Sequence, residues 1–122
     1  MGDMGEGYDR LAARLLDFVV AVIQLVNRLP GTVVGRHIGG QLVRAATSAG
    51  ANYEEARAGE SHADFLHKMQ VVLKELREAQ FWLRLVSRCE LRPQAECQPL
   101  LQEAGELCAI FAKSIVTAKK NA

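Results

Sequence analysis

The 122-residue sequence lacks the features that mark secreted and membrane-spanning proteins. Its three cysteines form no CxxC pair, and an odd number does not suit a closed disulfide framework. No apolar run approaches the roughly 20 residues that a helix needs to cross a bilayer. The N-terminal stretch MGDMGEGYDR has neither the basic segment nor the cleavage site of a secretory signal. We therefore expect a soluble, cytoplasmic protein with no membrane partner.

The sequence also has no excess of charge of one sign, because 15 Lys and Arg residues face 14 Asp and Glu residues, for a net charge of +1. A role in nucleic-acid binding would therefore need a local basic surface. Catalytic motifs are missing as well: there is no P-loop, dinucleotide fingerprint, HExxH or GxSxG element, and no Glu-x-x-His pair for a di-iron site. We expect neither catalysis nor a cofactor.

What the sequence does contain is helical periodicity. From Tyr8 to Leu29, apolar residues recur at steps of three and four, which is typical of a heptad seam. The same spacing predicts helices at about 8–29, 32–58, 61–88 and 99–119, and no segment shows the alternation of a strand. This pattern predicts an all-α fold, an antiparallel up-and-down four-helix bundle that spans 1–122 as a single domain.

The first predicted helix carries a second apolar seam beside the first. This apolar arc is wider than one side of a small bundle usually buries, so we expect part of it to face another subunit. The second seam consists of Ala12, Leu16, Val19, Ile23 and Val26.

The second predicted helix combines small residues with a line of polar ones. Gly35, Gly39 and Ala49 predict close contact with neighbouring helices. Arg44 and Glu55 lie about 16 Å apart along this helix, so each needs a partner from elsewhere, and Glu75 and Glu78 are the candidates for Arg44. The line can be a network that fixes helix register or subunit contact, or an anion site. We favour the structural interpretation for this polar line, which comprises Gln41, Arg44, Ser48, Asn52, Glu55 and Glu78.

The segment QLVRAATSAGANYEEA resembles the signature of a four-helix-bundle family associated with intervening sequences of bacterial large-subunit ribosomal RNA genes. The family's pattern is roughly Gln-x-x-Arg-Ala-x-x-Ser followed by Asn-x-x-Glu-Gly, and here Ala56 stands in place of its glycine. The stretch DFLHKMQVVLKELREAQFWLRL is similar to the family's third helix, and SIVTAKKN is similar to its C-terminal ending.

The resemblance covers nearly the whole chain and implies a helical bundle that assembles as a ring of five subunits. It implies no established activity. A basic relative, the accessory protein of diversity-generating retroelements, binds a reverse transcriptase and nucleic acid, and this chain bears a distant likeness to it. The near-neutral charge here differs from that relative's.

The third predicted helix supplies the candidate contacts to a nucleic acid or protein partner. A basic strip with an interleaved aromatic could track phosphates and stack a base, whereas the alternative interpretation is an ordinary solvated face. The candidate contacts are Lys74, Arg77, Phe81, Arg84 and Arg88.

Other groups favour structural roles. His62, Asp64 and His67 lie near one another, but the two histidines do not share a helix face, so we predict no metal site. Cys97 and Cys108 fall on an apolar seam and Cys89 is the better candidate for an exposed thiol. Trp82 is expected to pack in the bundle or between subunits. The sequence thus predicts a non-catalytic homopentameric interaction scaffold, with an RNA- or DNA-binding accessory module as the alternative.

Overall fold

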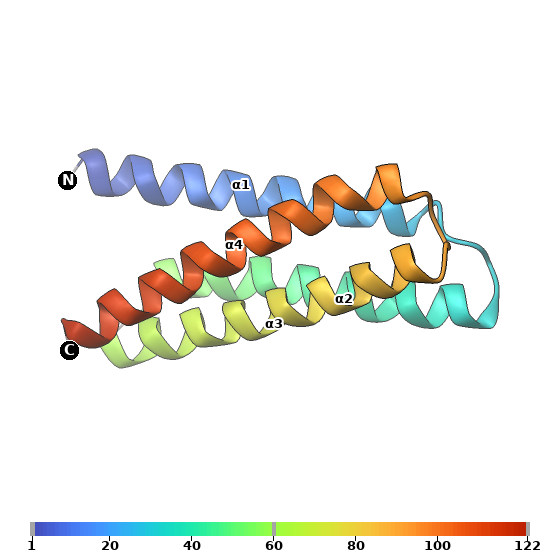
Figure 1. The fold of residues 1–122 in the computed structure, drawn as a ribbon. Coiled ribbons are helices and arrows are strands. Elements are labelled where there is room, and N and C mark those ends of the chain that lie inside the picture. The colour runs from blue at the N-terminus through green and yellow to red at the C-terminus, as the bar shows by residue number, and fades with distance from the viewer. Residues whose placement is uncertain (1, 60, 122) are drawn as a thin grey trace.

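Four antiparallel α-helices with short connections form the part of the chain that the computed structural model describes, residues 2–59 and 61–121, with side chains from residue 10 onward. Each helix runs opposite to the one before it, and the N- and C-terminal ends lie at the same end of the bundle (Figure 1). The predicted all-α, up-and-down four-helix bundle is confirmed. The helices are α1 (Gly2–Val26), α2 (Val33–Arg57), α3 (His62–Arg88) and α4 (Gln94–Lys120).

The boundaries of α1 differ from the predicted 8–29. The helix already begins at Gly2. It ends at Val26, because the hydrogen bonds of the next turn span three residues: Arg28 N–H donates to Leu25 O and Leu29 N–H to Val26 O, both at 3.0 Å. This tighter pattern closes a helix before the proline at position 30. The side chain of Tyr8, which opens the predicted seam, lies outside the described residues.

The start of α4 also differs, since the helix begins at Gln94 and not at 99. Pro93 is the N-cap residue, and its carbonyl accepts the first helical hydrogen bonds, from Glu96 N–H at 3.0 Å and Cys97 N–H at 3.3 Å. Pro99 is therefore inside the helix, in its second turn, where its ring is exposed. Pro93, the first of the two prolines, is therefore the one at which α4 begins.

Side-chain caps fix the starts of α2 and α3. Thr32 Oγ1 accepts a hydrogen bond from Gly35 N–H at 3.0 Å, and Ser61 Oγ accepts one from Asp64 N–H at 3.1 Å. Both cap residues have extended backbones, as N-caps do. The predicted opening of the third helix at Ser61 is confirmed.

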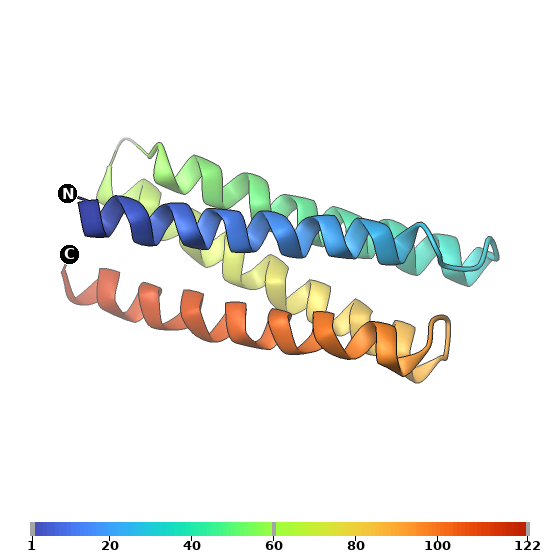
Figure 2. The same cartoon turned by 90° about the horizontal axis from the view of Figure 1, so that it is seen from above.

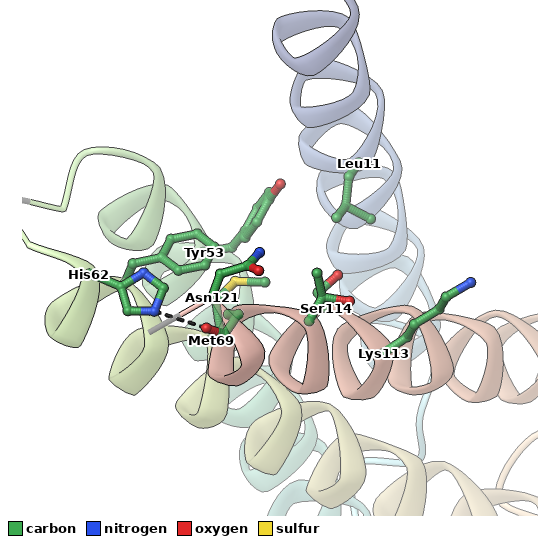
Figure 3. Close-up of a pocket in the computed structure, with 10 residues that line it drawn as sticks. Leu11, Tyr53, His62, Met69, Lys113, Ser114 and Asn121 are labelled. Carbon is green, nitrogen blue, oxygen red and sulfur yellow. Dashed lines mark hydrogen bonds between the residues drawn. The ribbon is translucent and has the colours of Figure 1, made fainter.

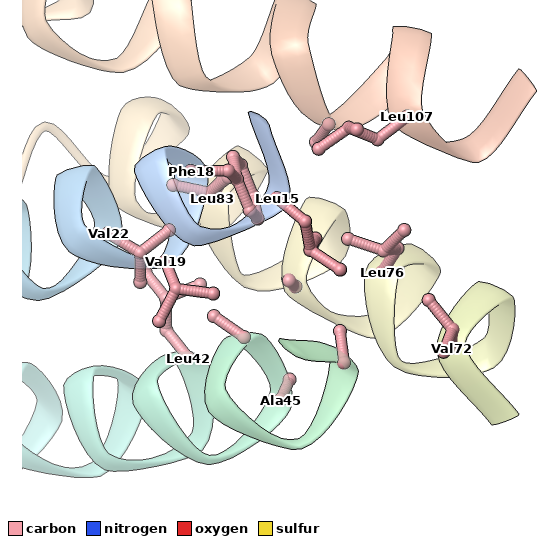
Figure 4. Packing of buried hydrophobic residues seen from close by; sticks show 14 of the residues in the cluster. Leu15, Phe18, Val19, Val22, Leu42, Ala45, Val72, Leu76, Leu83 and Leu107 are labelled. Carbon is pink, nitrogen blue, oxygen red and sulfur yellow. The ribbon is translucent and has the colours of Figure 1, made fainter. Parts of the chain in front are cut away.

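All four helices contribute to one apolar core (Figure 4). Small residues of α2 bring its backbone close to the neighbouring helices, as predicted: a Cβ atom at Gly39 would lie 3.0 Å from Val26 Cγ1, and Ala45 and Ala49 are fully buried. The largest fully buried side chains include Leu15, Val22 and Leu25 of α1, Leu42 and Tyr53 of α2, Met69, Leu76 and Leu83 of α3, and Leu107 and Phe111 of α4.

The helices meet unequally. The pairing of α2 with α3 is the most extensive, followed by α3 with α4 and α1 with α2, whereas α1 and α4 touch least. Seen from above, α3 crosses obliquely below α1 and meets α4 at the end where the two helices are connected (Figure 2). None of the described helices combines the length and the hydropathy that a bilayer crossing requires.

Candidate interaction surfaces

The polar line of α2 faces α3 and forms a network across the two helices. Arg44 Nη1 donates to Glu75 Oε2 at 3.3 Å, and Arg44 Nη2 forms an ion pair with Glu78. Ser48 Oγ donates to the same Glu75 carboxylate at 3.0 Å. The predicted contact from Arg44 to Glu75 and Glu78 is thus present. Each carboxylate is held by donors from the facing helix, as a partly buried charge requires.

The remaining members of the line extend this network toward both ends of α2. Gln41 Oε1 accepts a long hydrogen bond from Arg44 Nε at 3.4 Å. Asn52 Nδ2 donates to the Ser48 carbonyl at 2.8 Å. Glu55 pairs with Lys68 of α3 at 3.0 Å, a partner that the sequence did not indicate. All named members of the line therefore have partners inside the bundle, which supports the structural interpretation over an anion site.

Trp82 joins the network at its outer edge. Its indole Nε1–H donates to Glu78 Oε2 at 3.1 Å, and this bond, followed by the one from Arg44, holds the pKa of Glu78 below its usual range. The ring is partly buried and meets His37 edge-on, with ring centres 5.9 Å apart. Trp82 thus packs on the surface between α2 and α3. Its contact with another subunit, the alternative expectation, stays a prediction.

An apolar groove runs between α1 and α2, which we call the α1–α2 groove. On α1, Leu16 is 62% exposed and lies in the groove, and Val20 (45%) and Ile23 (37%) continue the same exposed side of α1 beyond it. Leu16 and Ile23 of the second seam are thus open to water, whereas Val19 of that seam is buried. On α2, Gly50 and Ala51 have little or no side chain and leave the groove open on that side. The groove has a volume of about 360 Å³ and is lined by Ala12, Leu15, Leu16, Val19, Thr47, Gly50, Ala51 and Glu54.

The candidate nucleic-acid contacts lie along the outer side of α3, as the spacing predicted. Phe81 is 50% exposed, and the basic side chains around it are exposed as well. None of these basic side chains has an ion-pair or hydrogen-bond partner in the described part of the chain. We call this set the α3 basic strip, and it consists of Lys74, Arg77, Arg84 and Arg88.

A third charged contact, which the sequence did not reveal, joins α1 to α4. Arg14 donates through Nε and Nη2 to the two oxygens of Glu103 and through Nη2 to Glu106 Oε1, each at 2.7 Å. This fork geometry raises the pKa of the guanidinium, chiefly through the bonds to Glu103. Hydrogen bonds from Gln102 and then Arg14 hold the pKa of Glu106 below its usual range. Only the register of α1 against α4 brings these groups together.

The histidines and cysteines occupy separate positions. His62 Nε2 lies 3.0 Å from the Ala118 carbonyl at the end of α4. Across residues 2–59 and 61–121, no three His, Cys, Asp or Glu residues are placed to hold a metal ion together. Cys89 is exposed, as expected, whereas burial raises the pKa of the Cys97 and Cys108 thiols. Neither buried thiol is therefore activated for nucleophilic chemistry.

These features define a small all-α bundle protein. Comparison with known families is specific: the chain belongs to the 23S rRNA-intervening sequence protein family, whose model matches residues 11–113. The resemblance seen in the signature segments is thereby confirmed, while the distant likeness to the retroelement accessory protein stays a prediction.

One similar solved structure comes from Bacteroides thetaiotaomicron and is described as a protein with unknown function from the S23 ribosomal protein family. It superposes with a TM-score of 0.80 at 28% sequence identity, over 88% of this chain and 96% of that one. No curated protein matches this chain. The comparisons thus agree with the bundle on fold and family, and neither match names an activity.

Proposed function

We propose that this chain is a non-catalytic interaction scaffold whose copies assemble into a homopentameric ring through the α1–α2 groove and the exposed apolar side of α1 that continues from it. The observation that carries the proposal is the exposure of Leu16, Val20 and Ile23 along one side of α1. Monomeric soluble proteins seldom leave contiguous large apolar side chains open to water. Covering them with a second copy would gain about 25 cal/mol per Å² of apolar surface.

The shape of the groove supports an occupant that is itself a helix. Large side chains of α1 form one wall, and the small residues Gly50 and Ala51 of α2 leave room beside them for a neighbour's side chains. Such small residues allow close approach of a helix backbone. The resemblance described above implies a ring of five copies of the same chain, so a helix of the neighbouring copy is the occupant that we propose.

The oligomeric state tests this assignment directly. We expect light scattering after size-exclusion chromatography to give the mass of an oligomer for the native chain, and of a monomer for the variant Leu16→Glu/Val20→Glu. Val33→Glu is the matched control, because Val33 is 75% exposed but belongs to α2 and lies neither in the groove nor on the exposed side of α1. Its mass should equal that of the native oligomer. A native chain that stays monomeric and fully folded at micromolar concentration would refute the scaffold.

A second candidate function, an RNA- or DNA-binding accessory module, is favoured by the α3 basic strip. Other arginines of the bundle, such as Arg14, Arg44 and Arg92, pair with glutamates. Those of the strip have no such partner in the described chain, and the half-exposed Phe81 between them offers a ring on which a base can stack. A ring of copies would repeat this strip around its circumference.

Binding of single-stranded RNA and DNA by fluorescence anisotropy tests this module. We expect Arg77→Ala/Arg84→Ala to weaken binding and to flatten the dependence of log K on log salt by about 0.7 for each lost phosphate contact. Arg36→Ala removes an exposed arginine outside the strip and should change binding little. No binding by the native chain at low salt would eliminate this function and leave the scaffold untouched.

A further inference from the structure

A cavity of about 700 Å³ opens at the end of the bundle that holds both termini (Figure 3). It lies between the first part of α1, the last part of α2, the start of α3 and the last turns of α4. Its apolar wall includes Leu11, Phe65 and Met69, and its polar rim includes Lys113, Ser114 and Thr117 of α4. This volume is within the range of small-molecule sites, about 300–1,000 Å³.

The cavity follows from the way α1 and α4 are held together. Ion pairs join them from Arg28–Glu96 near the connections to Arg14–Glu106 further along. Beyond Glu106 no ion pair joins the described parts of the two helices, and they diverge toward the termini (Figure 1). The side chains of α4 become small or polar in the same place, at Ser114 and Thr117. Contact between α1 and α4 is therefore lost there, while Ile115 and Ala118 on the other side of α4 stay buried.

The charged side chains around the opening of the cavity determine whether it favours an anionic or a cationic ligand. Lys113 is exposed on the rim and has no carboxylate partner within the described residues. No Asp or Glu is among the described residues that line the cavity. His62, also in the lining, is engaged with the Ala118 carbonyl and ties the start of α3 to the end of α4. Among the described lining residues, a ligand thus meets a cation and two hydroxyls at the rim, with an apolar wall behind them.

We propose that this cavity binds a free amphipathic monocarboxylate of medium chain length. The tail packs against Leu11, Phe65 and Met69, and the carboxylate pairs with the Lys113 ammonium and accepts a hydrogen bond from Ser114 or Thr117. The apolar wall supplies most of the affinity, because it removes the tail from water. The Lys113 ammonium and the hydroxyl donors at the rim favour binding of a carboxylate over an alcohol or an amine. The site lies within one copy of the chain and does not depend on the assembly proposed above.

Methyl NMR on the native chain tests the site, since the protein contains three methionines and Met69 lies in the cavity wall, 2% exposed. With ¹³C-methyl-methionine labelling and Met69→Leu to assign the signal, we expect decanoate to shift the Met69 methyl resonance in a saturable way below about 1 mM. Decan-1-ol and decylammonium carry the same tail without the carboxylate and should bind more weakly. Equal binding of all three probes, or no shift with decanoate, would overturn the proposal.

Two variants separate the rim from the wall. Lys113→Gln should weaken decanoate binding about fivefold, the limit for an exposed ion pair, and leave decanol binding unchanged. Lys120→Gln is the matched control, because Lys120 belongs to the same helix and is not in the lining. Ser114→Phe fills the opening and should abolish binding, with circular dichroism to confirm the fold. Equal effects of the two lysine variants, or undiminished binding by a folded Ser114→Phe, would contradict the site.

Discussion

Two contacts of the polar network converge on Glu78, and the charge of Lys74 acts on it as well. Its carboxylate pairs with Arg44, accepts the Trp82 indole N–H and lies one turn along from Lys74 on the same helix. Each of these contacts favours the charged carboxylate, which is why its pKa is lowered. A group with a lowered pKa in the folded state stabilises the fold above its unfolded-state pKa. It loses this contribution as pH falls through the folded value.

The single tryptophan makes this titration observable. We expect Trp82 fluorescence to change with a midpoint below the ordinary glutamate value of 4.5, because protonation of Glu78 alters the acceptor of its N–H bond. Glu78→Gln keeps an acceptor but cannot titrate, so the transition should disappear. The stability difference between the native chain and this variant should be largest at neutral pH and shrink in acid. A fluorescence transition that persists in Glu78→Gln would refute this assignment.

Two adjacent hydroxyls distinguish contacts between helices from contacts within one. Ser48 Oγ donates across to Glu75 on α3, whereas Thr47 Oγ1 donates to the Val43 carbonyl of its own helix at 2.7 Å. We expect Ser48→Ala to lower the free energy of unfolding by about 1 kcal/mol and Thr47→Ala to leave it within about 0.5 kcal/mol. Urea denaturation measures both. Equal losses would show that the Ser48 bond does not stabilise the helix pair.

At the scale of the element, the end of α3 has an unusual residue in an otherwise regular turn. Leu91 N–H donates to Val86 O at 2.9 Å and Glu90 N–H to Ser87 O at 3.1 Å, the two bonds of a Schellman motif. Glu90 has a φ of 55°, where glycine is the usual residue. A side chain in this region costs roughly 1–2 kcal/mol.

Replacement of Glu90 by glycine should therefore stabilise the protein by about 1 kcal/mol, measured by thermal or urea unfolding. Glu90→Ala keeps the Cβ atom and loses only the charge, so it serves as the control and should give no comparable gain. A gain of the same size in Glu90→Ala would assign the effect to charge and not to the backbone.

Much of the element structure was predictable, because the apolar periodicity is strong in all four segments. The end of α1 was not, since nothing in the spacing distinguishes the last α-helical turn from the tighter turn at Arg28 and Leu29. The start of α4 depended on which of two prolines opens the helix. Helix ends depend on local hydrogen bonds that hydrophobic spacing does not report.

Contacts between helices were predictable only where one helix offered few choices. Arg44 needed a carboxylate partner, and α3 carries Glu75 and Glu78 at the same level along the bundle axis. The pairs Arg14–Glu103 and Glu55–Lys68 were missed, because each needs the register of one helix against another. The cavity at the end of the bundle was missed for the same reason: it depends on how far α1 and α4 diverge.

On the scale of the whole molecule, the interfaces between neighbouring helices (the joints of the bundle) differ in chemistry. The joint between α1 and α2 is apolar, that between α2 and α3 carries the hydrogen-bonded network, and that between α1 and α4 is held by ion pairs. The outer side of α3 adds a basic surface. The exposed apolar side chains Leu16, Val20 and Ile23 thus lie on the helix that forms the apolar contact with α2.

The ion pairs between α1 and α4 lead to a prediction about local opening of α1. Arg14→Gln removes the fork to Glu103 and Glu106, so the first half of α1 should open more often, while α2 and α3 keep their protection. Because Arg14 is 37% exposed, we expect the local cost to be at most about 1 kcal/mol. Hydrogen exchange by mass spectrometry measures it, with Arg36→Gln as control. Uniform acceleration across all four helices would contradict a local role.

The placement of both chain ends at one end of the bundle has a mechanical consequence. A force that pulls these ends apart acts across the bundle and not along its length. It would separate α1 from α4 one turn at a time, beginning at the cavity where they already diverge, and would reach the Arg14 fork before the rest of the joint. Tethering the ends in an optical trap should therefore unfold this protein at low force, with α1 the first helix to detach.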